Sequence, residues 1–386
     1  MPIFSVPESL RTWAEVDLNA LRANLHFVRQ RIGPAPSILA VVKANGYGHG
    51  ARETVQALAG ENTIFGVANL QEAAEIKTVA NPSDVMLLGP CLPGERHAAV
   101  KNGHIVTVSS AIEARAFSEY GNVRINFKID TGMGRIGVWK DVAISELQSL
   151  QGIPGIEIHS ISTHLPSADE DTVFTKHQLN GFTKLAQKLR EMAPNARLHS
   201  LNSAGILTLP EFAGDIVRPG LMLYGCSPIA EFCTALRPVL AWKARIVLVK
   251  DLPAGAGVSY GRTYISSNPI RTAVLPVGYA DGYPRQASGQ GCGVLINGKR
   301  CHLIGRVTMD QIIIDVSELP DVQVGDVATL IGNDGVNSID AEELAKRSGT
   351  IAWDILTGIG RRVERFYSAA PEKKRDDSVE YQSPPV

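Results

Sequence analysis

Residues 38–43 read ILAVVK, and this apolar run is the first of eight similar runs that continue to about residue 225. Each run is short, mostly uninterrupted and rich in β-branched residues, which is typical of parallel strands covered by helices on both faces. The other runs are IFGVA (64–68), VMLLG (85–89), IVTVS (105–109), VRINFKID (123–130), IEIHSISTH (156–164), RLHSLN (197–202) and DIVRPGLMLYG (215–225).

Amphipathic stretches separate these runs and predict helices. A further helix is predicted at 17–31, before the first strand, with Asp17 as its N-cap. Eight strands that alternate with helices predict an α/β fold of the (β/α)8 barrel type, which we assign to residues 13–238. The clearest amphipathic stretches lie at 71–79, 111–120, 141–150 and 171–192.

The pattern changes after about residue 238. Short strands then follow one another with Gly, Asn or Asp at the turns, and helices are predicted only at 341–347 and 351–359. This succession is typical of antiparallel β structure. We therefore assign a β-rich, mainly antiparallel C-terminal domain to residues 239–370. The polar, Pro-rich segment 371–386 is predicted to be a disordered tail.

Composition limits the classes of function. The chain has 386 residues, with 38 Lys and Arg against 39 Asp and Glu, so its formal net charge is −1. This balance gives no support for a nucleic-acid partner or for an anionic membrane surface. No apolar run approaches the ~20 residues that span a bilayer, and no basic segment followed by an apolar one opens the chain. The five cysteines are scattered without a C-x-x-C pair, which favours reduced thiols in the cytoplasm over disulfides or a metal site.

Reactive side chains follow the predicted strands, at the end of the barrel where the active sites of this fold lie. Lys43 ends the first strand, and the glycines at 46, 48 and 50 let the backbone approach a ligand closely. A partly desolvated lysine at a barrel mouth can act as a nucleophile or a base. The ordinary alternative is a surface lysine that leaves a strand.

Other strand ends carry residues that bind anions or move protons. Lys128 and Arg135 belong to the fifth strand and its loop, His164 ends the sixth, Ser203 follows the seventh, and Arg218 lies in the eighth. Each alone has an ordinary explanation, such as an ion pair inside the barrel. Together they indicate a phosphate site after the last two strands. A lysine, an arginine and a phosphate cradle point to pyridoxal 5′-phosphate, held by the lysine as a Schiff base.

Eight segments within residues 13–367 closely resemble the motifs of the bacterial alanine racemase family, whose members are fold-type III pyridoxal-phosphate enzymes. They are VVKANGYGHG, KIDTGMGRIGV, THLPSADE, LNSAGI, VRPGLMLYG, VSYGRTY, PVGYADGYPR and GRVTMDQ. The resemblance implies a head-to-tail homodimer with active sites at the subunit interface. It also implies two-base interconversion of L-alanine and D-alanine, which supplies D-alanine for peptidoglycan.

The resemblance also implies roles for single residues. Lys43 matches the Schiff-base lysine, which is also the base specific for D-alanine. Tyr264 matches the base specific for L-alanine, delivered by the partner subunit. Arg218 matches the residue that faces the pyridine nitrogen, and His164 matches a residue that links it to the catalytic tyrosine.

Further matches concern the phosphate and the substrate. Phosphate contacts are implied for Tyr47, Ser203, Gly220 and the backbone of Met222. Substrate-carboxylate contacts are implied for Arg135 and for the backbone N–H of Met309, while Tyr279 matches a position that lines the entrance. Lys128 matches a lysine that is carbamylated in many members and that orients Arg135.

One departure from the family pattern concerns substrate choice. The family usually has Tyr-Glu near the C-terminus, where this chain has Trp353 and Asp354. Indole is bulkier than phenol and only donates a hydrogen bond, so the change either repacks locally or alters side-chain specificity. The alternatives are a broader amino-acid (serine) racemase, a decarboxylase of the same fold type, and a non-catalytic pyridoxal-phosphate carrier. The TGMGRIG and TMDQ segments argue against the decarboxylase, and Tyr264 in a second domain argues against the carrier.

Overall fold

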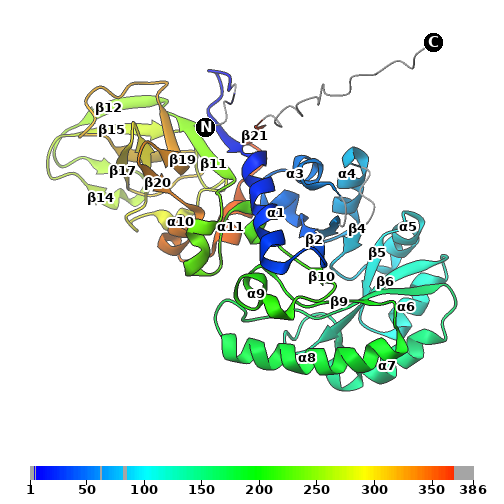
Figure 1. Ribbon diagram of the computed structural model, residues 1–386. Coiled ribbons are helices and arrows are strands. Elements are labelled where there is room, and N and C mark those ends of the chain that lie inside the picture. Colours follow the sequence, from blue (N-terminus) through cyan, green and yellow to red (C-terminus); the bar gives the residue numbers. More distant parts are fainter. Residues whose placement is uncertain (1–3, 5, 61–62, 81–84, 369–386) are drawn as a thin grey trace, which may run out of the picture.

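The computed structural model describes residue 4 and residues 6–60, 63–80 and 85–368 (Figure 1). The predicted tail at 371–386 lies outside these residues. Two bodies are visible: a barrel surrounded by helices, and a second domain of β-strands beside it. The first and last described strands both lie close to the junction of the two bodies.

The barrel is a parallel sheet with the order β10-β2-β3-β4-β5-β6-β8-β9. Backbone bonds close it between the last two strands, because Asp215 donates to the carbonyl of Leu198 (2.9 Å) and Arg218 donates to that of Leu201 (3.0 Å). The predicted α/β barrel is therefore confirmed. Its strands are β2 (Ser37–Val41), β3 (Thr63–Val67), β4 (Val85–Leu87), β5 (Ile105–Val108), β6 (Val123–Asp130), β8 (Ile156–Ser162), β9 (Arg197–His199) and β10 (Ile216–Val217), with β7 (Val138–Trp139) paired to β6.

Helices surround the barrel strands (Figure 1). Asp17 is the N-cap of α1, as predicted, because its carboxylate accepts the N–H groups of Asn19 and Ala20. The helices are α1 (Leu18–Ile32), α2 (Lys43–Tyr47), α3 (Ala51–Leu58), α4 (Leu70–Ala80), α5 (Arg96–Lys101), α6 (Ala111–Ser118), α7 (Ala143–Gln151), α8 (Thr172–Met192) and α9 (Ser203–Thr208).

Apolar side chains fill the barrel. Strands β3, β4 and β5 are buried along their whole length, as expected of strands covered on both faces. Phe65, Met86 and Phe127 are among the largest fully buried side chains. Each such side chain contributes about 1.5–3 kcal/mol by leaving water. The strands thus form a rigid support, and the polar residues at their ends are held by it.

The second domain is built on a sheet with the order β12-β15-β18-β17-β16-β19-β11-β1-β21. Neighbouring strands in this sheet are antiparallel, except for β1 and β21, which are parallel. The predicted mainly antiparallel domain is therefore confirmed. The elements are β11 (Leu240–Arg245), β12 (Leu248–Leu252), β13 (Gly257–Val258), β14 (Tyr264–Ile265), β15 (Ile270–Leu275), β16 (Gly293–Ile296), β17 (Lys299–Ile304), β18 (Ile312–Asp315), β19 (Val327–Asp334), β20 (Asn337–Ile339), α10 (Ala341–Ser348), α11 (Ala352–Gly358) and β21 (Glu364–Tyr367).

One strand of this sheet comes from the start of the chain. β1 (Thr12–Val16) pairs with β11 antiparallel and with β21 parallel. Sheet membership therefore places residues 13–16 with the second domain, whereas the sequence assigned them to the barrel. The boundary at 238 stays a prediction.

Several predicted strands are shorter than expected, and two of these differences lie at the first and last strands of the barrel. The strand at 38–43 ends at Val41, and the strand at 215–225 is reduced to β10, followed by a 3-10 turn at Leu221–Tyr224. Pro219 explains the second difference, since it has no N–H to donate to a neighbouring strand. Among the described residues, no helix is long and apolar enough to cross a membrane.

Candidate active site

Lys43 begins an unusual turn at the barrel mouth. The backbone after it is left-handed, with φ of 52° at Ala44, 54° at Asn45, 60° at Gly46 and 51° at Tyr47. This conformation costs a residue with a Cβ atom roughly 1–2 kcal/mol. Side chains hold the turn, because Asn45 Oδ1 accepts the N–H of Ala51 (2.9 Å) and a carboxylate from α4 accepts that of Ala44. Lys43 therefore stands on a strained but well-anchored support.

The environment of Lys43 favours its neutral form. Partial burial and the charge of Arg135 lower the pKa of Lys43 below its ordinary value, while Glu72 opposes them. A lysine whose pKa is lowered has a larger neutral fraction near pH 7 and is a better nucleophile and base.

Arg218 is buried at the centre of the mouth, with 6% of its surface exposed. Its Nη2 donates to the carbonyls of Thr163 and Ser200, both at 2.8 Å. Burial lowers the pKa of Arg218 to about 10, so the guanidinium remains charged at neutral pH. It is a fixed donor that cannot accept a proton.

Two histidines accept hydrogen bonds from Arg218. Its Nη1 lies 2.8 Å from Nδ1 of His199, and its Nη2 lies 3.2 Å from Nδ1 of His164. Burial and the charge of Arg218 lower the pKa of His164 to about 2 and that of His199 well below its usual range. Both rings are therefore neutral. His199 carries its proton on Nε2, which lies 3.1 Å from Oδ1 of Asn126.

Lys128 and Arg135 lie on β6 and on the loop after it. Burial, then Arg218 and Arg135, hold the pKa of Lys128 well below its usual range. The loop is fixed by Asp130, whose carboxylate accepts the N–H groups of Gly132 (2.9 Å), Met133 (2.8 Å) and Arg135 (3.0 Å). The Lys128 amine thus lies within the influence of two guanidinium groups, which favour its neutral form.

A cradle of polar groups lies at the end of β10. Ser203 Oγ accepts the N–H of Gly220 (2.9 Å) and approaches that of Met222 (3.4 Å). A Cβ atom at position 220 would lie 2.7 Å from Oη of Tyr47, so only glycine leaves this space open. Hydroxyls and backbone N–H groups that converge in this way suit a phosphate. With the Lys43 amine and the Arg218 guanidinium nearby, the donor set fits pyridoxal phosphate.

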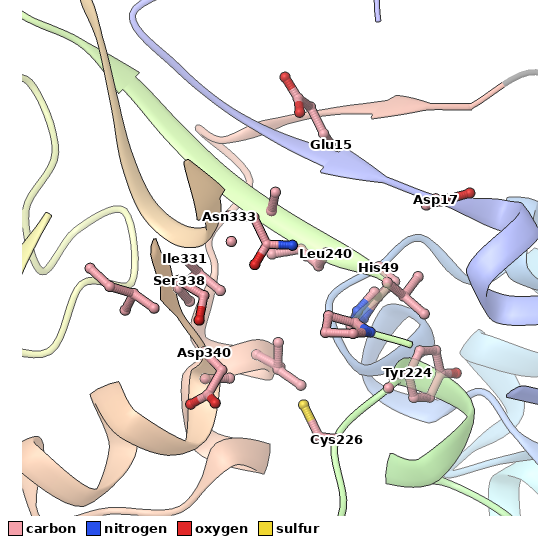
Figure 2. A pocket seen from close by; sticks show the side chains of 18 of the residues that line it. Glu15, Asp17, His49, Tyr224, Cys226, Leu240, Ile331, Asn333, Ser338 and Asp340 are labelled. Carbon is pink, nitrogen blue, oxygen red and sulfur yellow. The ribbon is translucent and has the colours of Figure 1, made fainter. Parts of the chain in front are cut away.

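The aromatic ring of Tyr47 lies between this mouth and a separate pocket. Tyr47 stacks on Tyr224 at 4.9 Å, and Tyr224 lines a pocket of about 550 Å³ between the two domains (Figure 2). Figure 2 shows Glu15, His49 and Asp340 around this pocket. Lys43 and Arg218 are not among its described lining residues. This pocket is therefore distinct from the mouth that holds Lys43 and Arg218.

Tyr264 does not lie near Lys43 of the same chain. It lies in β14, which pairs with β13 at the side of the second domain that is farther from the barrel (Figure 1). Met309 and Tyr279 lie next to each other in the second domain, since Tyr279 donates to the carbonyl of Thr308 and Ala280 to that of Met309 (3.0 Å each). The predicted residues thus form two groups, one in each domain.

Two residues of the mouth were missed by the sequence analysis. Glu72 accepts the N–H of Ala44, and Gln178 on α8 donates to Oγ1 of Thr131 (2.7 Å) and to the carbonyl of His164 (3.0 Å). For Glu72 a signal exists, because it lies four residues after the end of a predicted strand, in the first turn of a helix. For Gln178 the local sequence offers none. Among the described residues no cluster of side chains suits a metal ion.

Comparisons with known sequences agree with this arrangement. The family model described as "Alanine racemase, N-terminal domain" matches residues 16–228, and "Alanine racemase, C-terminal domain" matches residues 239–367. The alanine racemase of Halothermothrix orenii is 40% identical over 366 residues, which cover 92% of this chain and 96% of the relative. That of Symbiobacterium thermophilum is 40% identical over 368 residues, covering 92% and 97%.

Solved structures give the same result. The alanine racemase of a D-cycloserine-producing Streptomyces lavendulae superposes with a TM-score of 0.88 at 35% identity, covering 95% of this chain and 99% of that one. The Bacillus anthracis alanine racemase with bound L-Ala-P gives 0.84 at 34% identity, covering 94% and 96%. Both family models match in order and nearly the full chain is covered, so this protein belongs to the alanine racemase family of pyridoxal-phosphate-dependent isomerases.

Proposed function

We propose that Lys43 and Tyr264 are the two bases of this alanine racemase, and that they come from different subunits. The observation that supports this assignment is the convergence of Lys43, buried Arg218 and the Ser203–Gly220 cradle at one barrel mouth. Bound pyridoxal phosphate would withdraw electrons from the Cα–H bond of alanine. The chain supplies the groups that hold the cofactor and move the proton.

The mouth residues would bind the cofactor at three points. Tyr47, Ser203, Gly220 and the backbone N–H of Met222 would bind the phosphate, and Lys43 would form the covalent attachment. Arg218 would contact the ring nitrogen. Because the guanidinium only donates, it would leave that nitrogen unprotonated and so limit the withdrawal of electrons into the ring. Its four contacts with Thr163, His164, His199 and Ser200 keep it in place.

Racemisation needs a base on each side of the substrate. A proton leaves Cα on one face and returns on the other, so one side chain is not well placed for both steps. Lys43, with its lowered pKa, serves the D-alanine face. Tyr264 serves the L-alanine face, while Arg135 and the backbone N–H of Met309 bind the carboxylate.

We also propose that Lys128 is carbamylated. Its neutral Nζ can attack the carbon of CO2, a nitrogen–carbon bond forms, and one proton is released to solvent. The carbamate replaces a buried neutral amine by an anion between Arg218 and Arg135, and it would orient Arg135. A 13C resonance from labelled bicarbonate should be present in the wild-type enzyme and absent in Lys128→Met. Its absence from the wild type would contradict the proposal.

The homodimer is supported by two groups of exposed apolar side chains. One group follows the barrel strands β4, β5, β6 and β8 and comprises Leu92, Ile112, Trp139, Val142 and Val173. The other group belongs to the second domain and comprises Tyr260, Ile265, Tyr279 and Met309. Exposed apolar side chains that gather on one face mark interaction sites. A head-to-tail dimer would cover both groups and bring Tyr264 of the partner to Lys43.

Mixing two inactive variants tests the two-base assignment. Lys43→Ala and Tyr264→Phe should each lose nearly all conversion of L-alanine to D-alanine, measured by chiral chromatography. A hybrid dimer has one site with both substitutions and one site with neither, so subunit exchange between the variants should restore activity. Mixing that restores nothing, although mass spectrometry shows hybrid dimers, would contradict the shared site.

We further infer that the product, D-alanine, is used for peptidoglycan and that the enzyme is cytoplasmic. The family supports the first inference. All five cysteines are unpaired, which supports a reducing compartment.

A further inference from the structure

We propose that Glu72 is a positioning residue, which holds the left-handed turn after Lys43 and keeps a negative charge beside this lysine. The inference rests on the proposed function and adds a residue to its machinery. Glu72 lies in the first turn of α4, outside the barrel mouth motifs.

The carboxylate of Glu72 joins two neighbouring strand ends. Its Oε1 accepts the N–H of Ala44 at 2.8 Å, and its Oε2 accepts the N–H of Ala68, just after β3, at 2.7 Å. The backbone N–H of Glu72 donates to Oδ1 of Asn69 at 3.0 Å, which fixes the start of the helix. The residue directly after Lys43 is therefore tied to the rigid barrel through one side chain.

The turn needs such an anchor. Ala44, Asn45 and Tyr47 all have positive φ although they carry a Cβ atom. Conformations of this kind persist only where the surroundings determine them. The bond from Ala44 to Glu72 acts on the first strained residue, so its loss should let Lys43 move.

The charge of Glu72 offsets that of Arg135. The charged and titratable groups that face Lys43 are Glu72 on α4, Arg135 on the loop after β6, and His164 after β8. His164 is neutral. Burial and Arg135 lower the pKa of Lys43, and Glu72 raises it. Glu72 therefore limits how far the lysine is shifted towards its neutral form.

A second glutamate provides a matched control. Glu113 lies in the first turn of α6 and its Oε2 accepts the N–H of Ser109 at 2.8 Å. Ser109 and Glu113 are four residues apart, as Ala68 and Glu72 are. They follow β5, which is two strands after β3. Glu113 does not act on Lys43. Glu113→Gln thus neutralises a glutamate at an equivalent strand end without changing the charge beside the lysine.

The test follows the attachment of pyridoxal phosphate to apoenzyme as a function of pH. The unprotonated Nζ attacks the aldehyde carbon and water leaves, so the rate rises through the pKa of Lys43. Borohydride reduction and peptide mapping show that Lys43 has reacted. Glu72→Gln removes the negative charge beside Lys43. It should therefore shift the midpoint of the attachment rate against pH down by about 0.5–1 pH unit and slow the plateau rate several-fold. Glu113→Gln should match the wild type.

A double variant separates geometry from charge. Glycine adopts positive φ without a steric cost, so Ala44→Gly combined with Glu72→Gln should recover the plateau rate but keep the lowered midpoint. If Glu72→Gln alone does not fold, the double variant supplies the midpoint. The role of Glu72 is overturned if the midpoint is unchanged in both variants that carry Glu72→Gln, or if Glu113→Gln shifts it equally. Covalent attachment in Lys43→Ala would instead overturn the proposed function.

Discussion

At the scale of single residues, burial and one buried cation together set the protonation of the barrel mouth. Arg218 lowers the pKa values of Lys128, His164 and His199, although burial is the larger cause for each. The two histidines are therefore acceptors and not acids. This division of roles follows from a guanidinium that is held by four contacts and cannot accept a proton.

His49 gives the protein a pH-dependent stability. Burial lowers the pKa of His49 to about 4, whereas an unfolded histidine titrates near 6.5. The unfolded state binds the proton more tightly in this window, so the stabilisation is complete above about pH 6.5 and is lost as pH falls towards 4. Between pH 7 and 5 the wild type should lose about 2 kcal/mol more free energy of unfolding than His49→Gln, measured by urea titration.

The control for this prediction is a histidine at the surface. His26 is exposed on α1, so His26→Gln should show the pH dependence of the wild type. Parallel curves for the wild type and His49→Gln would rule out the contribution of His49.

Trp353 should have little influence on substrate choice. Its side chain is half-buried and packs against the hydrophobic core. Trp353→Tyr should therefore change the ratio of kcat/KM for L-alanine and L-serine by less than about threefold, because a residue that packs on its own core does not discriminate substrates. A change of tenfold or more, as expected of a substrate-pocket contact, would indicate a role in specificity.

At the scale of elements, the long barrel strands and α8 were predictable, and the shortest elements were not. The helix predicted at 171–192 is observed as Thr172–Met192, capped by Asp171, because its amphipathic period extends over many turns. β1 was missed, since its five residues form a strand only through partners more than 220 residues away. The sequence analysis ended the first strand at Lys43 and did not predict the left-handed turn that follows, because side-chain anchors from another helix impose its backbone.

The same limit applies to the site. Lys43, Arg218 and Ser203 follow recognisable strands, so the sequence identified the mouth. Glu72 and Gln178 act through backbone groups and loops that only the folded barrel brings close.

Helix α8 should contribute to the order of the mouth through one side chain. Gln178→Leu removes the bonds to Thr131 and to the carbonyl of His164, which connect the loops that carry Arg135 and His164. We expect a loss of about 1–3 kcal/mol in the free energy of unfolding and roughly a tenfold decrease in kcat/KM through misplacement of Arg135. Gln187→Leu, at an exposed position of the same helix, should change neither by a comparable amount. Equal effects of the two substitutions would show that α8 matters only as a whole.

At the scale of the whole molecule, activity should depend on protein concentration. If each mouth is completed by the partner, dilution below the dissociation constant separates Lys43 from Tyr264 and should abolish racemisation while covalently attached cofactor remains. Analytical ultracentrifugation and chiral product detection on the same dilution series test this. Fully active monomers would contradict the proposed dimer.

β1 also has a consequence for biosynthesis. This strand leaves the ribosome first, but its neighbours β11 and β21 are made only after the barrel and after most of the second domain, respectively. During translation it is an open edge, and such edges pair with other chains. A fragment that ends at residue 238 would keep this edge permanently, and one that starts at 239 would lack the strand between β11 and β21. The two halves of this gene product are therefore interlocked, and we expect neither to be inherited, expressed or exchanged as an independent module.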